Sequence, residues 1–359
     1  MKDKIEVVFT GGTIGSLATG NNISPDTNAR FMLINKFAER TNATKKYLER
    51  FDAVSPLYIL SENAVVDDII KMAKEIKDAE KKGVKGIIMT HGSDTLAFSA
   101  AYLGLLLPSL KVPVVLVASN LILTNSEANG VDNFIAAVNL IDSNPEPNVY
   151  VAYKNPEDSF TSIHLGTRMT EPPPYSDSFY SPQGYRFGIF KNGKIIFENT
   201  KITKSDRKFQ LKKSAFTTKE LYITPHTGLN YKVFEGASFD YVLHNLYHSG
   251  TANTREGAEY IDNNLLNFAV YCKENDKPLY LCNIKRKDIN YDSTNQMKKK
   301  NIEFLYDILP NTALAKLNIA FNLIGETERS DYLNSNINGE VLEANDKIDY
   351  ACVDNDKEL

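Results

Sequence analysis

Two short segments in the first third of the chain combine hydroxyl groups with glycines. The first is residues 10–15, Thr-Gly-Gly-Thr-Ile-Gly, which follow an apolar run at residues 5–9. Paired glycines such as Gly11 and Gly12 let backbone N–H groups approach a ligand closely, and Thr13 adds a hydroxyl group. An acyl-transfer enzyme needs such a nucleophilic oxygen beside backbone donors that hold the developing oxyanion. Taken alone, the segment favours an ordinary glycine turn; a nucleotide-phosphate loop would show GxGxxG or GxxxxGKS/T, and neither pattern is present here.

The second segment is residues 90–95, Thr-His-Gly-Ser-Asp-Thr, between an apolar run at 86–89 and a helical pattern at 96–107. Ser93 or Asp94 can cap the helix by accepting hydrogen bonds from its first N–H groups. In a functional interpretation, Asp94 offers a carboxylate to the amine of a ligand and Ser93 supplies a second hydroxyl. One residue can do both, so both interpretations stay open.

The elements that must position these segments are visible as alternating apolar runs and helical patterns. The runs are rich in β-branched residues and nearly all apolar, as expected of strands buried on both faces of a parallel sheet. We expect strands at residues 5–9, 53–60, 86–89, 113–118 and 149–153, and helices at 67–82, 96–107 and 131–143. This alternation predicts an open, doubly wound α/β fold. Ligands of such sheets bind beyond the carboxyl ends of the strands, where both segments lie.

A chain of 359 residues suits two domains. A hairpin turn is indicated at Asn192-Gly193, and a lysine-rich stretch follows it. We therefore predict an N-terminal catalytic α/β domain at 1–190, a linker or strap at 191–219, a smaller C-terminal α/β domain at 220–345 and a flexible tail at 346–359. In the C-terminal domain we expect strands at 221–224, 241–247 and 278–282 and helices at 255–274 and 311–323.

Composition limits the classes of function. A hydrophobic fraction of 42% with 24% charged residues is that of a folded globular protein. The net charge of −4, spread along the chain, argues against a nucleic-acid surface. The 3 cysteines are widely spaced, which favours reduced thiols over a disulfide framework. The first apolar run is too short for a secretory signal, and no segment approaches the roughly 20 apolar residues of a membrane span. We expect a cytoplasmic protein that binds neither membrane nor nucleic acid.

Together the two segments resemble the L-asparaginase/glutaminase family. That family carries TGGTI and a small residue after its first strand, and HG(T/S)DT after a later one. Residues 10–15 and 91–95 match these motifs in the same order and strand context. Weaker similarity extends from about residue 4 to residue 342 and includes residues 60–63, 168–170, 179–182, 250–252 and 336–340. The resemblance is closer to the cytoplasmic, type I branch.

The resemblance implies a two-domain amidohydrolase that converts L-asparagine to L-aspartate and ammonia through an acyl-enzyme. Thr13 would be the nucleophile, with Ser93 and Asp94 as its catalytic partners. Asp94 would also bind the α-amino group of the substrate and Ser61 its α-carboxylate. The substrate-binding residues would be Gly12, Ser61, Glu62 and Gly92. A homodimer or homotetramer is also implied, and amide hydrolysis by a hydroxyl group needs no cofactor.

Glu171 departs from the family pattern, in which a lysine follows Arg-x-T/V. Glu171 would take part in catalysis as a general base if burial near Asp94 raised its pKa. Alternatively, Lys154 reaches the site from elsewhere, or the pocket has lost its chemistry and binds an amino acid in a regulatory role. A further alternative is a subunit that feeds ammonia to a tRNA-charging partner. Such chains generally carry an extra domain before TGGT, whereas the first strand here begins near residue 5.

The sequence offers one possible pair of metal ligands, His244 and His248. Side chains four residues apart do not converge on a strand as they do on a helix, and we expect a strand over 241–247. No third ligand is evident, so we expect structural histidines and no metal site.

Overall fold

The computed structural model describes residues 3–19, 22–25, 27–211, 216–286, 289–300 and 302–342. Among these residues, the chain forms two compact units. The first contains the residues up to 211 together with Ile337–Gly339, and the second contains residues 216–336 together with Glu340–Leu342. The tail that we expect to be flexible, 346–359, lies outside the described residues.

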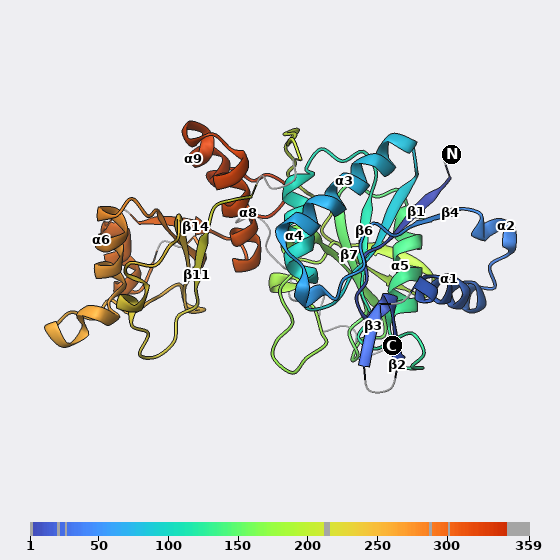
Figure 1. The fold of residues 1–359 in the computed structure, drawn as a ribbon, viewed down its shortest axis with the longest axis horizontal. Coiled ribbons are helices and arrows are strands. Elements are labelled where there is room, and N and C mark those ends of the chain that lie inside the picture. The colour runs from blue at the N-terminus through green and yellow to red at the C-terminus, as the bar shows by residue number, and fades with distance from the viewer. Residues whose placement is uncertain are drawn as a thin grey trace. The chain divides into compact units, whose positions relative to one another are not determined.

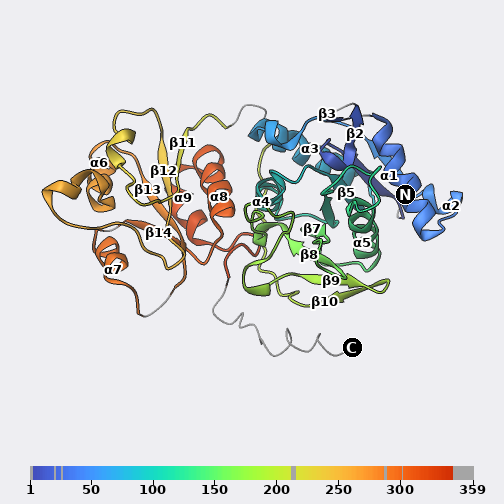
Figure 2. The same ribbon diagram turned by 90° about the horizontal axis from the view of Figure 1, so that it is seen from below.

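The first unit is built on one large sheet. Its strands are β1 (Ile5–Phe9), β4 (Phe51–Val54), β5 (Gly86–Thr90), β6 (Val114–Val117), β7 (Val149–Tyr153), β8 (Thr161–Leu165), β9 (Gly188–Lys191) and β10 (Lys194–Phe197). Within the described residues the sheet is eight-stranded, in the order β10-β9-β8-β7-β6-β5-β1-β4. The strands from β4 to β7 run parallel, and β8, β9 and β10 continue the sheet in antiparallel pairs. Figure 2 shows β8, β9 and β10 in succession beside β7. A separate hairpin of β2 (Ser16–Thr19) and β3 (Asn22–Pro25) follows the first loop. The predicted α/β fold class is confirmed.

Helices cover both faces of this sheet. They are α1 (Thr27–Thr41), α3 (Val66–Lys82), α4 (Leu96–Leu106) and α5 (Gly130–Asp142), with a short α2 (Lys45–Leu48). Figure 1 shows α3 and α4 on one face and α1 and α5 on the other. α5 buries Phe134, Val138 and Ile141 in a core shared with the strands. α4 is apolar on nearly every side and buried along almost its whole length, as expected of a helix enclosed by its neighbours.

The strand order creates a topological switch point between β1 and β5. From β1 the chain crosses to β4 on one side of β1 and then returns to β5 on the other side. β1 and β5 are parallel, with Phe9 opposite Thr90, so the loops that leave them start at the same edge of the sheet. Open α/β sheets bind their ligands in the crevice at such a point.

Some predicted strands differ from the structure. β4 ends at Val54 rather than at residue 60, because the chain leaves the sheet at Ser55-Pro56, and proline cannot donate to a strand ladder. The chain meets the first loop again through a bridge between Ile59 and Gly11. β8 was not predicted, because it mixes polar and apolar residues that are nevertheless all buried.

The turn predicted at Asn192-Gly193 is confirmed. Both residues have positive φ, 52° and 74°, and they join β9 to β10 as an antiparallel hairpin. β10 therefore belongs to the sheet, although its residues fall within the range that we expected to be the strap.

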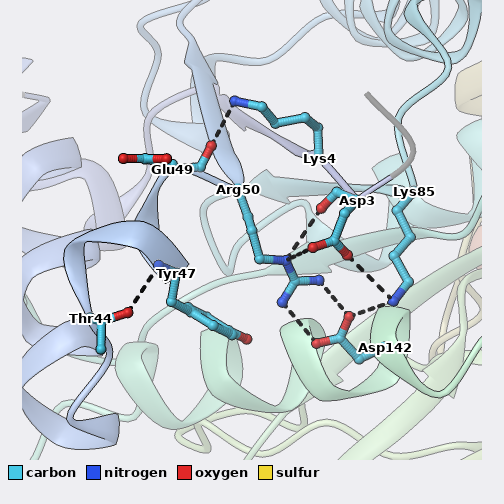
Figure 3. Close-up of polar contacts among 8 residues, drawn as sticks. All are labelled: Asp3, Lys4, Thr44, Tyr47, Glu49, Arg50, Lys85 and Asp142. Carbon is cyan, nitrogen blue, oxygen red and sulfur yellow. Dashed lines mark hydrogen bonds and ion pairs between the residues drawn. The ribbon is translucent and has the colours of Figure 1, made fainter.

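Ion pairs hold together the amino end of the sheet, opposite the switch point. Arg50, which precedes β4, donates two hydrogen bonds to Asp142 at the end of α5, with N···O distances of 3.1 and 2.6 Å. Lys85, which precedes β5, donates to the same carboxylate at 2.8 Å. Figure 3 shows Arg50 between Asp142 and Asp3, whose carboxylate lies 3.2 Å from the guanidinium. These pairs therefore lie at the edge of the sheet opposite the loops that follow β1 and β5.

The second unit is a smaller α/β layer. Its strands are β11 (Glu220–Ile223), β12 (Tyr241–Asn245), β13 (Leu279–Ile284) and β14 (Glu303–Tyr306), and its helices are α6 (Leu265–Glu274), α7 (Asp292–Lys299), α8 (Pro310–Leu323) and α9 (Glu326–Asn334). The strands form a parallel sheet in that order. The helix predicted at 255–274 is wrong in its first half: Asn264 caps α6, accepting a hydrogen bond from the Leu266 N–H at 2.7 Å, and residues 258–263 form a 3-10 turn instead.

Candidate active site

The first loop is held in an unusual backbone conformation by its own hydrogen bonds. Gly12 has a φ of 73°. Its N–H donates to the Ile59 carbonyl at 3.0 Å, and its carbonyl accepts a hydrogen bond from the Ser16 hydroxyl at 2.7 Å. Thr13 then starts a single 3-10 turn and is half-buried. The hydroxyl that the sequence singled out therefore sits on a fixed turn at the switch point.

The two loops pack directly against each other. A Cβ atom on Gly12 would lie 2.3 Å from the backbone nitrogen of Gly92, and one on Gly92 would lie 2.3 Å from the hydroxyl oxygen of Ser61. Real Cβ atoms do not approach other atoms so closely. Gly12 meets backbone and has a positive φ, so that position requires glycine, whereas a Cβ on Gly92 would displace the Ser61 side chain. At the base of the loops, the Thr10 hydroxyl donates to the Thr90 carbonyl at 2.6 Å. The structure thus brings Gly12, Gly92 and Ser61 into one contact.

Ser61 comes from a third segment, a 3-10 turn at Ser61–Asn63 that follows β4. Its side chain is 4% exposed, and its hydroxyl donates to a carboxylate oxygen of Asp94 at 3.3 Å. The hydroxyl of Thr95 donates to the Ser61 carbonyl at 3.0 Å. Glu62, the next residue in the turn, is exposed. The third segment is therefore joined to the second loop through both its side chain and its backbone.

The interpretation of Ser93 and Asp94 as helix caps is not supported. The N-cap position of α4 is Thr95, and no side-chain hydrogen bond caps the helix within this described segment. Ser93 contributes its backbone carbonyl, which accepts from the Leu96 N–H at 3.3 Å. Ser93 is half-buried and Asp94 is exposed, so the functional interpretation of both residues stays a prediction.

Glu171 is not brought into this cluster by any contact among the described residues. It follows a turn at Gly166–Arg168, and the neighbouring Thr170 N–H donates to the Tyr180 carbonyl at 2.9 Å. The Glu171 side chain is exposed at the surface. Partial desolvation nevertheless raises its pKa, and Asp94 is not among the causes. The sequence suggested that Asp94 lies close to Glu171, but a nearby Asp94 is not what raises the pKa of Glu171.

Lys154 does not supply the missing lysine in this structure. It follows β7, and its ammonium group lies 3.3 Å from the carboxylate of Asp132 on α5. The same carboxylate also pairs with Arg40 at 3.0 Å. Lys154 is therefore engaged with the helix rather than with Thr13 or Asp94.

Three polar residues around the site were not identified from the sequence as contributors. Thr10, Ser16 and Thr95 each donate a side-chain hydrogen bond to a backbone carbonyl of a site segment. Thr10 and Thr95 stand in the matched motifs, which was the available signal, whereas Ser16 lies beyond the first motif. His91 is buried and its Nδ1 lies 2.7 Å from the Gly92 carbonyl; burial lowers its pKa, which favours the neutral ring.

The histidines of the second unit do not form a metal site in the described segments. His244 lies on β12, fully buried, with Nε2 2.9 Å from the Tyr231 hydroxyl. Burial lowers its pKa to about 4, so the ring is neutral near pH 7. Elsewhere in the described residues, no group of three or more His, Cys, Asp and Glu side chains is arranged to hold a metal ion. Over the same residues, no helix combines the length and apolar character that crossing a bilayer requires.

The amino-acid sequence is similar to those of known proteins. Curated relatives include a glutamyl-tRNA(Gln) amidotransferase subunit of Saccharolobus islandicus, 24% identical over 330 residues, with 88% of this chain and 71% of the relative covered. The corresponding amidotransferase subunit of Methanosphaera stadtmanae is 25% identical, with the same shares covered.

Solved structures establish the fold. The thermostable L-asparaginase from Thermococcus kodakarensis superposes with a TM-score of 0.77 at 20% identity, covering 95% of this chain and 100% of that one. A probable cytoplasmic L-asparaginase from Campylobacter jejuni gives a TM-score of 0.68 at 21% identity, covering 92% of this chain and 99% of that one. The family model described as Asparaginase, N-terminal matches residues 4–203. Since that match spans more than half of the 359 residues and contains both loops of the switch point, this protein belongs to the asparaginase family.

Proposed function

We propose that this protein hydrolyses L-asparagine to L-aspartate and ammonia at the switch point of the first unit. The observation that carries the proposal is the contact of Gly12, Gly92 and Ser61, with Asp94 hydrogen-bonded to Ser61. Thr13 and Ser93 each follow one of the two glycines in the chain. Three loops thus bring three hydroxyl-bearing residues, Thr13, Ser93 and Ser61, and the carboxylate of Asp94 to the edge where an open α/β sheet binds its ligand.

Substrate binding would use charges that complement a free amino acid. The Ser61 hydroxyl would donate to the α-carboxylate, exchanging its present hydrogen bond with Asp94 for one with the substrate. The Asp94 carboxylate would then pair with the α-ammonium group, and Glu62 would add a second negative charge nearby. Gly12 and Gly92 would let the backbone approach the substrate, because neither has a side chain.

The chemistry would proceed in two steps that pass through one ester on Thr13. The Thr13 hydroxyl oxygen attacks the side-chain amide carbon, the C–N bond breaks, and the departing nitrogen takes up the proton to leave as ammonia. Water then attacks the ester, which releases aspartate and restores the threonine hydroxyl. Backbone N–H groups of the loops would hold the oxyanion in both steps. Glu171 is the candidate general base because it stands where the family carries its lysine; it would have to approach Thr13 when substrate binds, and its raised pKa would then bring the carboxyl group closer to the working pH.

The direct test is ammonia release from L-asparagine by the native protein and by Thr13→Ala. We expect release by the native protein and a loss of at least about 10³-fold in Thr13→Ala, as for a missing nucleophile. Thermal unfolding of both proteins checks that the variant is folded. Unchanged release by folded Thr13→Ala would exclude the proposed nucleophile.

A second candidate function is favoured by the curated relatives, which are glutamyl-tRNA(Gln) amidotransferase subunits. In that case the chain would supply ammonia to a partner protein that binds tRNA. An isolated chain that is silent with asparagine and glutamine, but releases ammonia once combined with such a partner and tRNA, would favour this candidate. Full activity of the isolated chain with asparagine favours hydrolysis.

We also propose a cytoplasmic location and a homodimer or homotetramer. Family membership supports the assembly, and the composition supports the location. Sedimentation of the purified protein tests the assembly: a monomer at micromolar concentration would contradict it.

A further inference from the structure

Thr95 makes a contact that the proposed chemistry does not use. Its hydroxyl donates to the Ser61 carbonyl at 3.0 Å, which joins the loop after β5 to the turn after β4. Thr95 occupies the N-cap position of α4, yet its side chain makes no capping hydrogen bond to that helix. The hydroxyl is therefore directed at the neighbouring loop and not at its own helix.

The Ser61 carbonyl accepts two hydrogen bonds of different kinds. The Ala64 N–H donates to it at 3.0 Å and closes the 3-10 turn locally. Thr95 donates from a separate segment. Removing the Thr95 hydroxyl thus leaves the local turn closed and weakens the connection between the two loops.

The surroundings of Ser61 show why that connection matters. The Ser61 hydroxyl oxygen lies over Gly92, only 2.3 Å from where a Cβ on Gly92 would be. Its hydrogen bond to Asp94 is long, at 3.3 Å. Gly92 limits the approach of Ser61 from one side, and Thr95 holds its backbone from another. A shift of the turn would displace the hydroxyl from its place beside Asp94.

We propose that Thr95 is a positioning residue that holds Ser61 where its hydroxyl binds the α-carboxylate of the substrate. The inference rests on the proposed function, because it names the part of that site on which Thr95 acts. Thr95 itself does not touch the substrate in this account. Its loss would weaken binding of substrate and transition state equally, which raises KM and leaves kcat unchanged.

The test uses Thr95→Val, which keeps the shape of the side chain and removes the hydroxyl. We expect the Kd for L-aspartate, measured by calorimetry, to rise about 2- to 13-fold, as for the loss of one hydrogen bond. KM for asparagine should rise by the same factor, and kcat should stay within about twofold. Thr95→Ser should restore binding, because it returns the hydroxyl. The matched control is Thr41→Val, which removes a similar hydrogen bond to the Phe37 carbonyl, 2.7 Å long, on α1; it should leave the Kd unchanged.

A double-mutant cycle separates positioning from general stability. In a Ser61→Ala background the hydroxyl that Thr95 positions is gone, so Thr95→Val should change the Kd by less than about 1.5-fold. An undiminished effect in that background would overturn the inference, as would native-like binding by Thr95→Val or a fall in kcat without a change in binding. A native protein that neither binds aspartate nor hydrolyses asparagine would refute the proposed function and the inference together. If only the inference about Thr95 is wrong, the native protein still binds aspartate and hydrolyses asparagine.

Discussion

At the scale of single residues, the site depends on two positions that have no room for a side chain. Gly12 and Gly92 contact each other, and Gly92 also contacts Ser61. The sequence motifs predicted glycines beside hydroxyl groups, but their mutual packing follows from the register of β1 and β5. That register could not be predicted here, because β1 and β5 are buried on both faces and a strand without polar alternation does not mark which residues pair.

Gly92→Ala should impair activity by displacing Ser61. The new Cβ would lie 2.3 Å from the Ser61 hydroxyl oxygen, so that side chain must move. Displacement of about 1 Å at a binding group can reduce kcat/KM about 10²-fold, and steady-state kinetics with asparagine measures it. The matched control is Gly325→Ala, where a Cβ meets no atom within 4 Å and φ is not positive. Equal activity of both variants would contradict the described packing.

Glu171→Gln tests the departure from the family pattern. If Glu171 is the general base, we expect kcat to fall about 10²- to 10⁴-fold. Since desolvation raises the pKa of Glu171, the native kcat/KM should fall with decreasing pH through a pKa above the usual glutamate value, and the Gln variant should lack this limb. A Gln variant with native rate and native pH profile would exclude the role.

Glu171→Lys distinguishes an active site from a decayed one. A silent native protein together with an active Lys variant would show that the pocket has lost its chemistry and only binds an amino acid. We expect the native protein to release ammonia.

At the scale of elements, the buried parallel strands were predictable and the exceptions have physical reasons. The strand at residues 5–9 and the strand at 149–153 match β1 and β7 within their bounds, because continuous apolar runs mark strands covered on both faces. β8 was missed because burial of polar residues such as Ser162 and His164 is tertiary information. The loops at the switch point were predictable because parallel strands bring their carboxyl ends to one edge.

The ion pairs at the amino end of the sheet should stabilise the first unit without affecting catalysis. Burial alone would raise the pKa of Asp142, but hydrogen bonds from Arg50 and Lys85 outweigh it and lower that pKa. Asp142→Asn should reduce the free energy of unfolding by about 1–2 kcal/mol at pH 7, between the values for an exposed pair and a charge-assisted hydrogen bond. Urea titration measures the loss, and asparagine turnover should stay unchanged.

The pH dependence of that loss has a definite sign. A carboxyl group whose pKa is lowered on folding stabilises the protein above its unfolded pKa, here near 3.8, and this contribution disappears as pH falls through the lower folded value. The difference in the free energy of unfolding between the native protein and Asp142→Asn should therefore be largest near pH 7 and shrink below about pH 4. Asp78→Asn is the control, since Asp78 pairs with Lys81 at the exposed surface and should cost little at either pH. Equal losses of unfolding free energy in Asp142→Asn and Asp78→Asn would contradict a stabilising role for the ion pairs of Asp142.

At the scale of the whole molecule, the sequence predicted an α/β protein with its chemistry in the first part of the chain. The family model covers that part, residues 4–203, and both loops fall within it. The sequence did not predict that the turn at Ser61–Asn63 is joined to the loop after β5 by hydrogen bonds of Ser61 with Asp94 and Thr95. Hydrogen bonds between residues more than thirty positions apart, such as those of Ser61 to residues 94 and 95, depend on the folded sheet.

The central claim is that Thr13 carries the acyl group during turnover. Acid quenching during hydrolysis of L-asparagine, followed by mass spectrometry of the digested protein, tests it most directly. We predict an aspartyl ester on the peptide that contains Thr13, and no ester in the Thr13→Ala variant. Turnover with the ester on another residue would contradict it.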